Sequence, residues 1–185
     1  MMCNMGNNNL WDNFLKGDKK ALALLFQVHY EELFSYGRKL SGSKNLTEDC
    51  LQDLFLKLWI NREKLPEIKN LKAFLFTSYR NLIIDCLRWQ QRFVNHESNT
   101  NTNLHIEFSA EDILIRKHVD LEAREVMLNT LNRLTERQKE AIYLRFFDEL
   151  SFESIAQVMD INVQSVRNCI HRGIQALREI FPKEA

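Results

Sequence analysis

Glycine and proline, the residues that most often interrupt regular secondary structure, are scarce in this sequence: 5 and 2 among 185 residues. Leucine, isoleucine and phenylalanine are frequent, and apolar residues recur at spacings of three and four, the period of a helix with one buried face. The length suits one large or two small domains. We therefore expect an all-α protein.

Cysteine and histidine occur without the spacing of a metal site. The four cysteines, Cys3, Cys50, Cys86 and Cys169, include no C-x-x-C pair, and the five histidines show no H-x-x-H or H-E-x-x-H spacing. A zinc or disulfide framework is therefore not indicated. We expect free thiols in a reducing compartment, no metal and no cofactor.

Long apolar runs and net charge are also missing. No run approaches the length of a membrane span, and the Asn-rich start lacks a signal-peptide core, so we expect a cytoplasmic protein. The net charge of 0 conceals an excess of positive charge in the N-terminal half, because residues 1–95 hold 14 Lys and Arg against 10 Asp and Glu. A protein that held DNA alone would be more basic, since phosphate neutralisation supplies most non-specific affinity. Another molecule is therefore expected to supply the electrostatic attraction.

A polar segment divides the chain. The stretch "VNHESNTNTNLHIEFSAED" is rich in Asn, Ser and Thr and has no periodic apolar stripe. We therefore expect two small helical domains, residues 10–93 and 112–182, joined by a flexible acidic and polar linker at residues 94–111. "TERQ" at the start of a later helix predicts a capping box, with Thr135 as N-cap.

The C-terminal end has the pattern of a helix-turn-helix. "LSFESIAQVMD" predicts a short helix over 152–159, and "INVQSVRNCIHRGIQALRE" predicts a second helix capped by Asn162. Small Ala156 stands where the helices must approach, and Asp160 occupies the turn position that needs a positive φ. Such a motif places the start of its second helix in the DNA major groove. A plain helical pair with a solvated face is the alternative. The base-edge candidates are Gln164, Ser165, Arg167 and Asn168, and the phosphate candidates are His171 and Arg172.

The segment "TEDCLQDLFLKLW" predicts a helix with Thr47 as N-cap and two distinct faces. One face is apolar, whereas Asp49, Gln52 and Asp53 form an acidic face that Leu56 interrupts. Carboxylates near a helix N-terminus are favoured by the helix dipole, so a solvated face is one interpretation. A docking face for a basic partner helix is the other, and this segment alone favours neither.

The segment "NLKAFLFTSYRNLIIDCLRWQQRF" predicts a long helix capped by Asn70 in which cations and aromatics interleave. Aromatic rings beside Arg and Lys suit unstacked bases above a neutralised backbone, as in proteins that bind single strands. The same aromatic residues could equally be core. The cations are Lys69, Lys72, Arg80, Arg88 and Arg92, and the aromatics are Phe74, Tyr79 and Trp89.

In this order and spacing, these segments resemble the bacterial RNA polymerase sigma factors of the extracytoplasmic-function type. The resemblance covers roughly residues 10–93 and 120–181. Its most specific pieces are "TEDCLQDLFLKLW", "YRNLIIDCLR" and "LTERQKEAIYLRFFDELSFESIAQVMDINVQSVRNCIHRGIQALRE". It implies a two-domain protein that binds core RNA polymerase, reads the −10 and −35 promoter elements, and is not an enzyme.

The resemblance also implies roles for residues. Asp49, Gln52 and Asp53 match positions that dock on the clamp helices of the polymerase β′ subunit, and Leu56 lies among them. Asn81 and Asp85 match positions that read exposed −10 bases. The loop at 61–70 matches one that helps hold a flipped base, and the helix-turn-helix matches the −35 reader that meets the β flap. The full set of −10 candidates is Lys72, Tyr79, Arg80, Asn81, Asp85 and Arg88.

The sequence departs from the family at three positions. Trp89 stands where a basic residue is usual, Tyr79 where a small one is usual, and Asp160 where the turn glycine is usual. The first two departures put the lining of the −10 pocket in question.

The resemblance implies core RNA polymerase, promoter DNA and an anti-sigma factor as partners, with no small-molecule substrate. The segment "QSVRN" resembles Bacteroidetes members, which are often paired with a membrane-anchored anti-sigma of the FecR-like kind. One alternative is a LuxR-type helix-turn-helix regulator, but its sensor or receiver half would be built on strands. An enzyme that used Glu48, Asp49 and Asp53 is disfavoured, because no second acidic or histidine motif stands at matching spacing.

Overall fold

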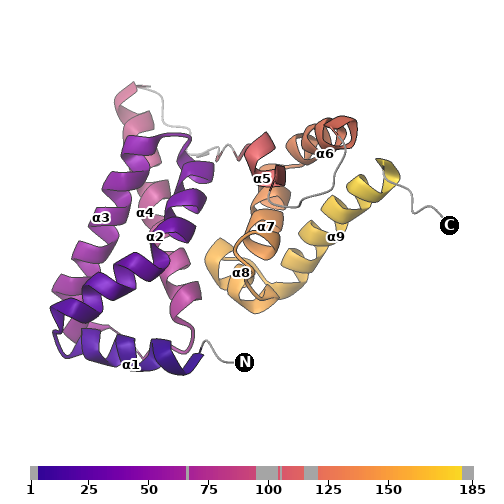
Figure 1. Ribbon diagram of the computed structural model, residues 1–185. Coiled ribbons are helices and arrows are strands. Elements are labelled where there is room, and N and C mark those ends of the chain that lie inside the picture. Colours follow the sequence, from indigo (N-terminus) through magenta and orange to yellow (C-terminus); the bar gives the residue numbers. More distant parts are fainter. Residues whose placement is uncertain (1–3, 66, 95–103, 105, 115–120, 181–185) are drawn as a thin grey trace. The chain divides into compact units, whose positions relative to one another are not determined.

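The computed structural model describes residues 4–65, 67–94, 104, 106–114 and 121–180. Within these ranges it contains α-helices and one short 3₁₀ helix, and no strand (Figure 1). The prediction of an all-α protein is therefore confirmed. The chain divides into two compact units, Met1–Asn103 and Leu104–Ala185.

The first unit is built around three long helices. Helices α2, α3 and α4 pack against one another, and α1 packs against α2. Asp18 caps the start of α2 by accepting a hydrogen bond from the Lys20 N–H at 2.8 Å, and Gly42, with φ of 66°, ends it. The elements are α1 (Asn4–Leu15), α2 (Lys19–Ser41), α3 (Lys44–Asn61), η1 (Arg62–Lys64) and α4 (Leu71–Val94) (Figure 1).

Helix α3 begins one turn earlier than its sequence indicated. The prediction of Thr47 as N-cap is wrong, because Ser43 accepts the hydrogen bond from the Leu46 N–H and is the cap. Thr47 lies inside the first turn, is fully buried, and donates its hydroxyl to the Ser43 carbonyl at 2.7 Å. A serine in extended conformation satisfies the orphan N–H groups as well as threonine does, so the two candidates could not be separated by type. The predicted cap of α4 is confirmed, since Asn70 accepts from the Ala73 N–H at 3.1 Å.

The three long helices meet around Tyr79 of α4, which is fully buried. Its hydroxyl donates to the Thr47 carbonyl oxygen at 2.9 Å, so the ring bridges α4 and α3. Gly37 of α2 lies against the same point, where a Cβ atom would collide with the Tyr79 hydroxyl. Glycine at this position lets α2 approach the other two helices closely, and the same packing keeps Tyr79 from solvent.

The second unit contains α5 (Ala110–Leu114), α6 (Leu121–Arg133), α7 (Glu136–Phe146), α8 (Phe152–Met159) and α9 (Val163–Ile180). The predicted capping box is confirmed. The Thr135 hydroxyl accepts a hydrogen bond from the Gln138 N–H, and the Gln138 side-chain oxygen accepts one from the Thr135 N–H. Helix α9 packs on α6, α7 and α8. Gly173 makes the α7 crossing possible, because a Cβ there would collide with the Ile142 side chain.

The end of the predicted linker packs on the second unit. Ile106 and Phe108 are almost fully buried, with exposures of 0% and 2%. The Phe108 backbone exchanges two hydrogen bonds with the Asn132 amide, at 2.8 and 3.0 Å, and the Ile106 N–H donates to Glu136. Residues 95–103 and 105 lie outside the described residues. The polar stretch therefore contains two apolar side chains, Ile106 and Phe108, that pack on the second unit, and the linker bounds of 94–111 stay a prediction.

The described helices are amphipathic rather than uniformly apolar. None of them combines the length and the apolar composition that crossing a bilayer requires.

Candidate functional site

The outer face of α3 carries the four residues predicted to bind the polymerase. Asp49, Gln52 and Asp53 are exposed at the helix surface, and Leu56 is 56% exposed. Their spacing of three and four puts them on one side of the helix. Ile60, one turn further on, is 65% exposed and extends the same side. This face, residues 49, 52, 53, 56 and 60, is called the α3 face below.

Sequence patterning did not single out Ile60, although its spacing of two from Leu58 and five from Phe55 places it off the buried stripe. The feature that could have revealed it is its distance of four residues from Leu56. An exposed pair of large aliphatic side chains beside two carboxylates is unusual for a merely solvated helix face.

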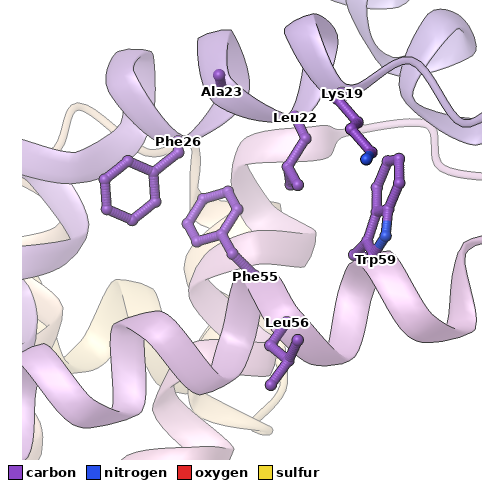
Figure 2. Close-up of a pocket in the computed structure, with 7 residues that line it drawn as sticks. All are labelled: Lys19, Leu22, Ala23, Phe26, Phe55, Leu56 and Trp59. Carbon is purple, nitrogen blue, oxygen red and sulfur yellow. The ribbon is translucent and has the colours of Figure 1, made fainter.

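An apolar pocket of about 410 Å³ lies beside the α3 face, between the start of α2 and the second half of α3 (Figure 2). Phe26 of α2 and Phe55 of α3 both line it and are in edge-to-face contact, with ring centroids 5.0 Å apart. Leu56 lines the pocket and also belongs to the α3 face. The acidic face is therefore continuous with a concave apolar surface. The remaining lining residues are Lys19, Leu22, Ala23 and Trp59.

Helix α4 presents an exposed stripe formed by Asn81, Asp85 and Arg88. The three follow one another at spacings of four and three, so they share one side of the helix. Asp85 and Arg88 form an ion pair at 3.6 Å, with side-chain exposures of 71% and 49%. Such an exposed pair is worth little in stability, so both groups are available to another molecule at small cost. Arg80 borders the stripe and is half-buried.

Two of the predicted −10 residues do not lie with this stripe. The prediction that Tyr79 contacts DNA is wrong, because its ring is fully buried and its hydroxyl donates a hydrogen bond to the Thr47 carbonyl. Lys72 comes nine residues before Asn81, about two and a half helical turns, and therefore lies on the other side of α4. Its ammonium pairs with Glu32 of α2 at 2.8 Å and lies 5.7 Å from the Phe76 ring centroid.

The three aromatic candidates on α4 have different environments. Phe74 is half-buried and packs edge-on against Trp11 of α1, and Tyr79 is core. Trp89 is 60% exposed beside Arg88. Of the three, only Trp89 presents a ring surface of the kind that an unstacked base could cover.

The loop at 61–70 begins with η1. Arg62 donates to the Trp59 carbonyl at 2.9 Å, and its guanidinium lies 4.7 Å from the Trp59 ring centroid. This contact fixes the start of the loop on α3. Pro66 lies outside the described residues.

Helices α8 and α9 have the geometry of a helix-turn-helix. Asp160 takes the left-handed conformation, with φ of 53° and ψ of 51°, and its N–H closes the end of α8. Ala156 and Val166 are buried where the two helices pack. Asn162 caps α9 by accepting from the Ser165 N–H at 2.7 Å. The predictions for the turn and for the cap are therefore confirmed.

The exposed side of α9 carries the residues predicted to contact DNA. Gln164, Arg167 and Asn168 are exposed, and Ser165 is half-buried. The Gln164 side-chain amide donates to the Asn168 side-chain oxygen Oδ1 at 3.1 Å, so these two polar groups are held together. His171 and Arg172 are exposed one turn further along.

Arg167 is positioned by the first helix of the motif. Its guanidinium lies 5.9 Å from the Phe152 ring centroid, at the start of α8. Backbone and Ser151 hydrogen bonds, with the Arg167 charge, lower the pKa of Glu153 below its usual 4.5. Arg167 therefore has an aromatic ring and a carboxylate of α8 near it, while its guanidinium offers the planar set of donors that suits a bidentate contact.

Comparison with known proteins connects these surfaces to a family. Residues 25–93 match the family model "Sigma-70 region 2", and residues 124–177 match "Sigma-70, region 4". Together the two matches cover more than half of the chain. The α3 face and the α4 stripe fall within the first match, and α8 and most of α9 fall within the second.

Relatives among characterised proteins match most of the chain. The ECF RNA polymerase sigma factor SigW of Bacillus subtilis is 24% identical over 169 residues, covering 89% of this chain and 90% of the relative. The ECF RNA polymerase sigma factor SigL of Mycobacterium tuberculosis is 28% identical, with coverages of 89% and 93%. The RNA polymerase sigma factor CarQ of Myxococcus xanthus is 26% identical, with coverages of 92% and 94%.

Solved structures share the fold. CnrH in complex with the cytosolic domain of CnrY has a TM-score of 0.64 at 19% identity, with coverages of 97% of this chain and 99% of that chain. RpoE of Bartonella quintana in complex with the anti-sigma factor NepR has a TM-score of 0.62 at 23% identity, with coverages of 90% and 99%.

The match to region 2 also accounts for the N-terminal half of the chain, which a LuxR-type regulator leaves unexplained, and the comparisons give that alternative no support. Regions 2 and 4 occur in this order, and the sigma-factor relatives match most of the chain. The chain therefore belongs to the sigma-70 family and is an RNA polymerase sigma factor of the extracytoplasmic-function type, which directs promoter-specific initiation of transcription.

Proposed function

We propose that the α3 face is the surface through which this sigma factor docks on core RNA polymerase, on the clamp helices of the β′ subunit. The observation that carries the proposal is the continuity of the carboxylates at Asp49 and Asp53 with exposed Leu56, Ile60 and the adjoining apolar pocket. A basic, partly apolar helix complements such a surface in charge and in shape. Aliphatic groups provide the buried area, and the carboxylates orient the partner.

The two units divide promoter recognition between them. We propose that the α4 stripe of Asn81, Asp85 and Arg88, with Arg80 beside it, reads the exposed −10 strand. Gln164, Ser165, Arg167 and Asn168 read −35 base edges in the major groove, while His171 and Arg172 contact phosphates. The domain limits proposed for these roles are residues 10–93 for region 2 and 112–182 for region 4. Region 4 also meets the β flap.

The proposed partners are core polymerase, promoter DNA and an anti-sigma factor. CnrH is solved in complex with the cytosolic domain of CnrY, and the sigma factor RpoE is solved in complex with the anti-sigma factor NepR. By analogy, an anti-sigma factor of the membrane-anchored FecR-like kind is proposed for this chain, with an origin in the Bacteroidetes. The proposed place of action is the cytoplasm, where the polymerase is, and no enzymatic activity is proposed.

The docking proposal is tested by replacing Asp49, Gln52 and Asp53 together with alanine. Binding to immobilised core polymerase should weaken by roughly 100-fold, about 2.7 kcal/mol, because loss of charged partners at a buried interface costs about 2–5 kcal/mol. The three side chains lie on the helix surface, outside the core, so the thermal unfolding of the variant should be nearly unchanged.

A matched control removes two carboxylates and one amide elsewhere on the same unit. Asp12, Gln27 and Glu31 are exposed on α1 and α2, and their triple alanine variant should bind core polymerase as the parent does. If the α3 variant keeps the affinity of the parent, or if both variants lose it equally, the α3 face is not the docking surface.

A further inference from the structure

Two cysteines that are far apart in sequence lie side by side in the first unit. Cys50 of α3 and Cys86 of α4 are separated by 36 residues, and their sulfur atoms are 3.3 Å apart, with the Cys50 thiol donating to the Cys86 sulfur. Both are free thiols in the structure. An S–S bond is about 2.05 Å long, so the sulfurs would have to approach by little more than an ångström to be joined.

The two thiols differ in their access to solvent. The Cys50 side chain is buried, with 2% of the residue exposed, whereas Cys86 is half-buried. Burial, together with the hydrogen bond to Cys86, raises the pKa of Cys50 to about 12. A dissolved oxidant therefore meets Cys86 first, and Cys50 stands directly behind it as the second sulfur.

We propose that Cys50 and Cys86 are a thiol-oxidation site at which hydrogen peroxide produces an intramolecular disulfide between α3 and α4. In the first step the Cys86 sulfur attacks one oxygen of the peroxide. The O–O bond breaks, an S–O bond forms, and the released hydroxide takes up the thiol proton and leaves as water, so that Cys86 becomes a sulfenic acid.

In the second step the Cys50 sulfur attacks the sulfur of that sulfenic acid. The S–O bond breaks, the S–S bond forms, and the departing hydroxide takes the Cys50 proton and leaves as a second water. The two thiols together lose two electrons, which the peroxide accepts. An added dithiol returns the pair to free thiols by exchange.

The position of this site gives the disulfide a specific effect. Cys50 stands between Asp49 and Asp53 in sequence, and Cys86 follows Asp85, but the carboxylates lie on the helix surfaces and the sulfurs face each other. The bond would therefore form behind the α3 face and the α4 stripe and tie the two helices together. The crosslink would join residues 36 positions apart and so restrict the unfolded chain. The oxidised first unit should therefore be more stable than the reduced one.

Mass spectrometry of the full chain tests the proposal directly. After treatment with hydrogen peroxide, denaturation and alkylation, a peptide pair that joins Cys50 to Cys86 should appear, two hydrogen atoms lighter than the free peptides and absent after dithiothreitol. The midpoint of thermal unfolding of the first unit should rise by roughly 10 °C or more on oxidation. A Cys86→Ser variant should show neither change, whereas a Cys169→Ser variant should show both, since Cys169 lies on α9 in the other unit.

Three results would overturn the proposal. The first is full alkylation of Cys50 and Cys86 after peroxide treatment that has oxidised Cys3 or Cys169. The second is crosslinking of these thiols only between two molecules, as seen in non-reducing gels. The third is a Cys50–Cys86 peptide pair that appears equally in chain that was denatured before the peroxide was added and in folded chain, because the pairing would then not depend on the packing of α3 against α4.

Discussion

Tyr79 gives a direct test of whether a residue expected at the DNA surface is structural instead. The Tyr79→Phe substitution keeps the ring and deletes the buried hydroxyl, and with it the 2.9 Å hydrogen bond to the Thr47 carbonyl. Because the ring is fully buried, water cannot replace the missing donor. We expect the free energy of unfolding of the first unit to fall by about 1–2 kcal/mol.

Urea unfolding and thermal scans of the full chain measure this effect. For a unit of this size, a decrease of this magnitude corresponds to a midpoint lower by roughly 5–10 °C, while the transition of the second unit stays in place. Tyr30→Phe, at a half-buried tyrosine of α2, is the matched control and should cost less. Transcription from a panel of −10 variants, assayed well below the unfolding midpoint, should keep the order of the parent. Unchanged stability with a changed −10 preference would refute the assignment of Tyr79 to the core.

Two further predictions concern charged residues. Arg167→Ala should relax discrimination at one −35 position by about 1–3 kcal/mol, whereas Arg172→Ala should weaken all −35 variants alike and reduce the salt dependence. Equal scaling of every promoter by both substitutions, in transcription from a −35 panel, would move base reading to other residues of α9. Near Glu32, His29 Nδ1 at 3.9 Å and the Lys72 ammonium at 2.8 Å lower the pKa of the Glu32 carboxyl below 4.5. Glu32→Gln should therefore destabilise the chain above pH 4.5, and the difference from the parent should shrink as the pH falls through the lowered pKa. A difference that grows in acid would contradict the ion pair.

Sequence periodicity was sufficient where one local pattern decides the structure. The capping box at Thr135, the positive φ at Asp160 and the cap at Asn162 each depend on residues within a few positions, and all three are present. The helix-turn-helix and its exposed residues follow from these local signals. The roles of those residues toward DNA stay predictions.

Tertiary packing decided the features that the sequence did not predict. By residue type Tyr79 could be an exposed aromatic or part of the core, and it is buried where α2 approaches at Gly37 and α3 offers the Thr47 carbonyl. The proximity of Cys50 to Cys86 depends on how α3 and α4 pack, which no spacing within one helix encodes. Phe108 stands in a polar stretch without periodicity, yet it packs near Phe147, with ring centroids 5.8 Å apart.

The exposed apolar residues of α3 show a different limit of periodicity. Leu56 interrupts an acidic face, and Ile60 follows it at a spacing of four, on the same side of α3. Their exposures of 56% and 65% show that α3 has two apolar sides, one packed and one open. A binary pattern assigns apolar residues to the interior and therefore cannot separate a docking residue from a core residue.

The central claim is that this chain converts core RNA polymerase into a promoter-specific enzyme. The most direct measurement adds the purified chain to core polymerase on fragmented genomic DNA of its source and sequences the 5′ ends of the transcripts. We expect starts to cluster downstream of one shared pair of −10 and −35 sequences, and the clustering to disappear with the triple alanine variant at Asp49, Gln52 and Asp53. A distribution of starts identical to that of core polymerase alone, from a chain that is folded, would contradict the claim.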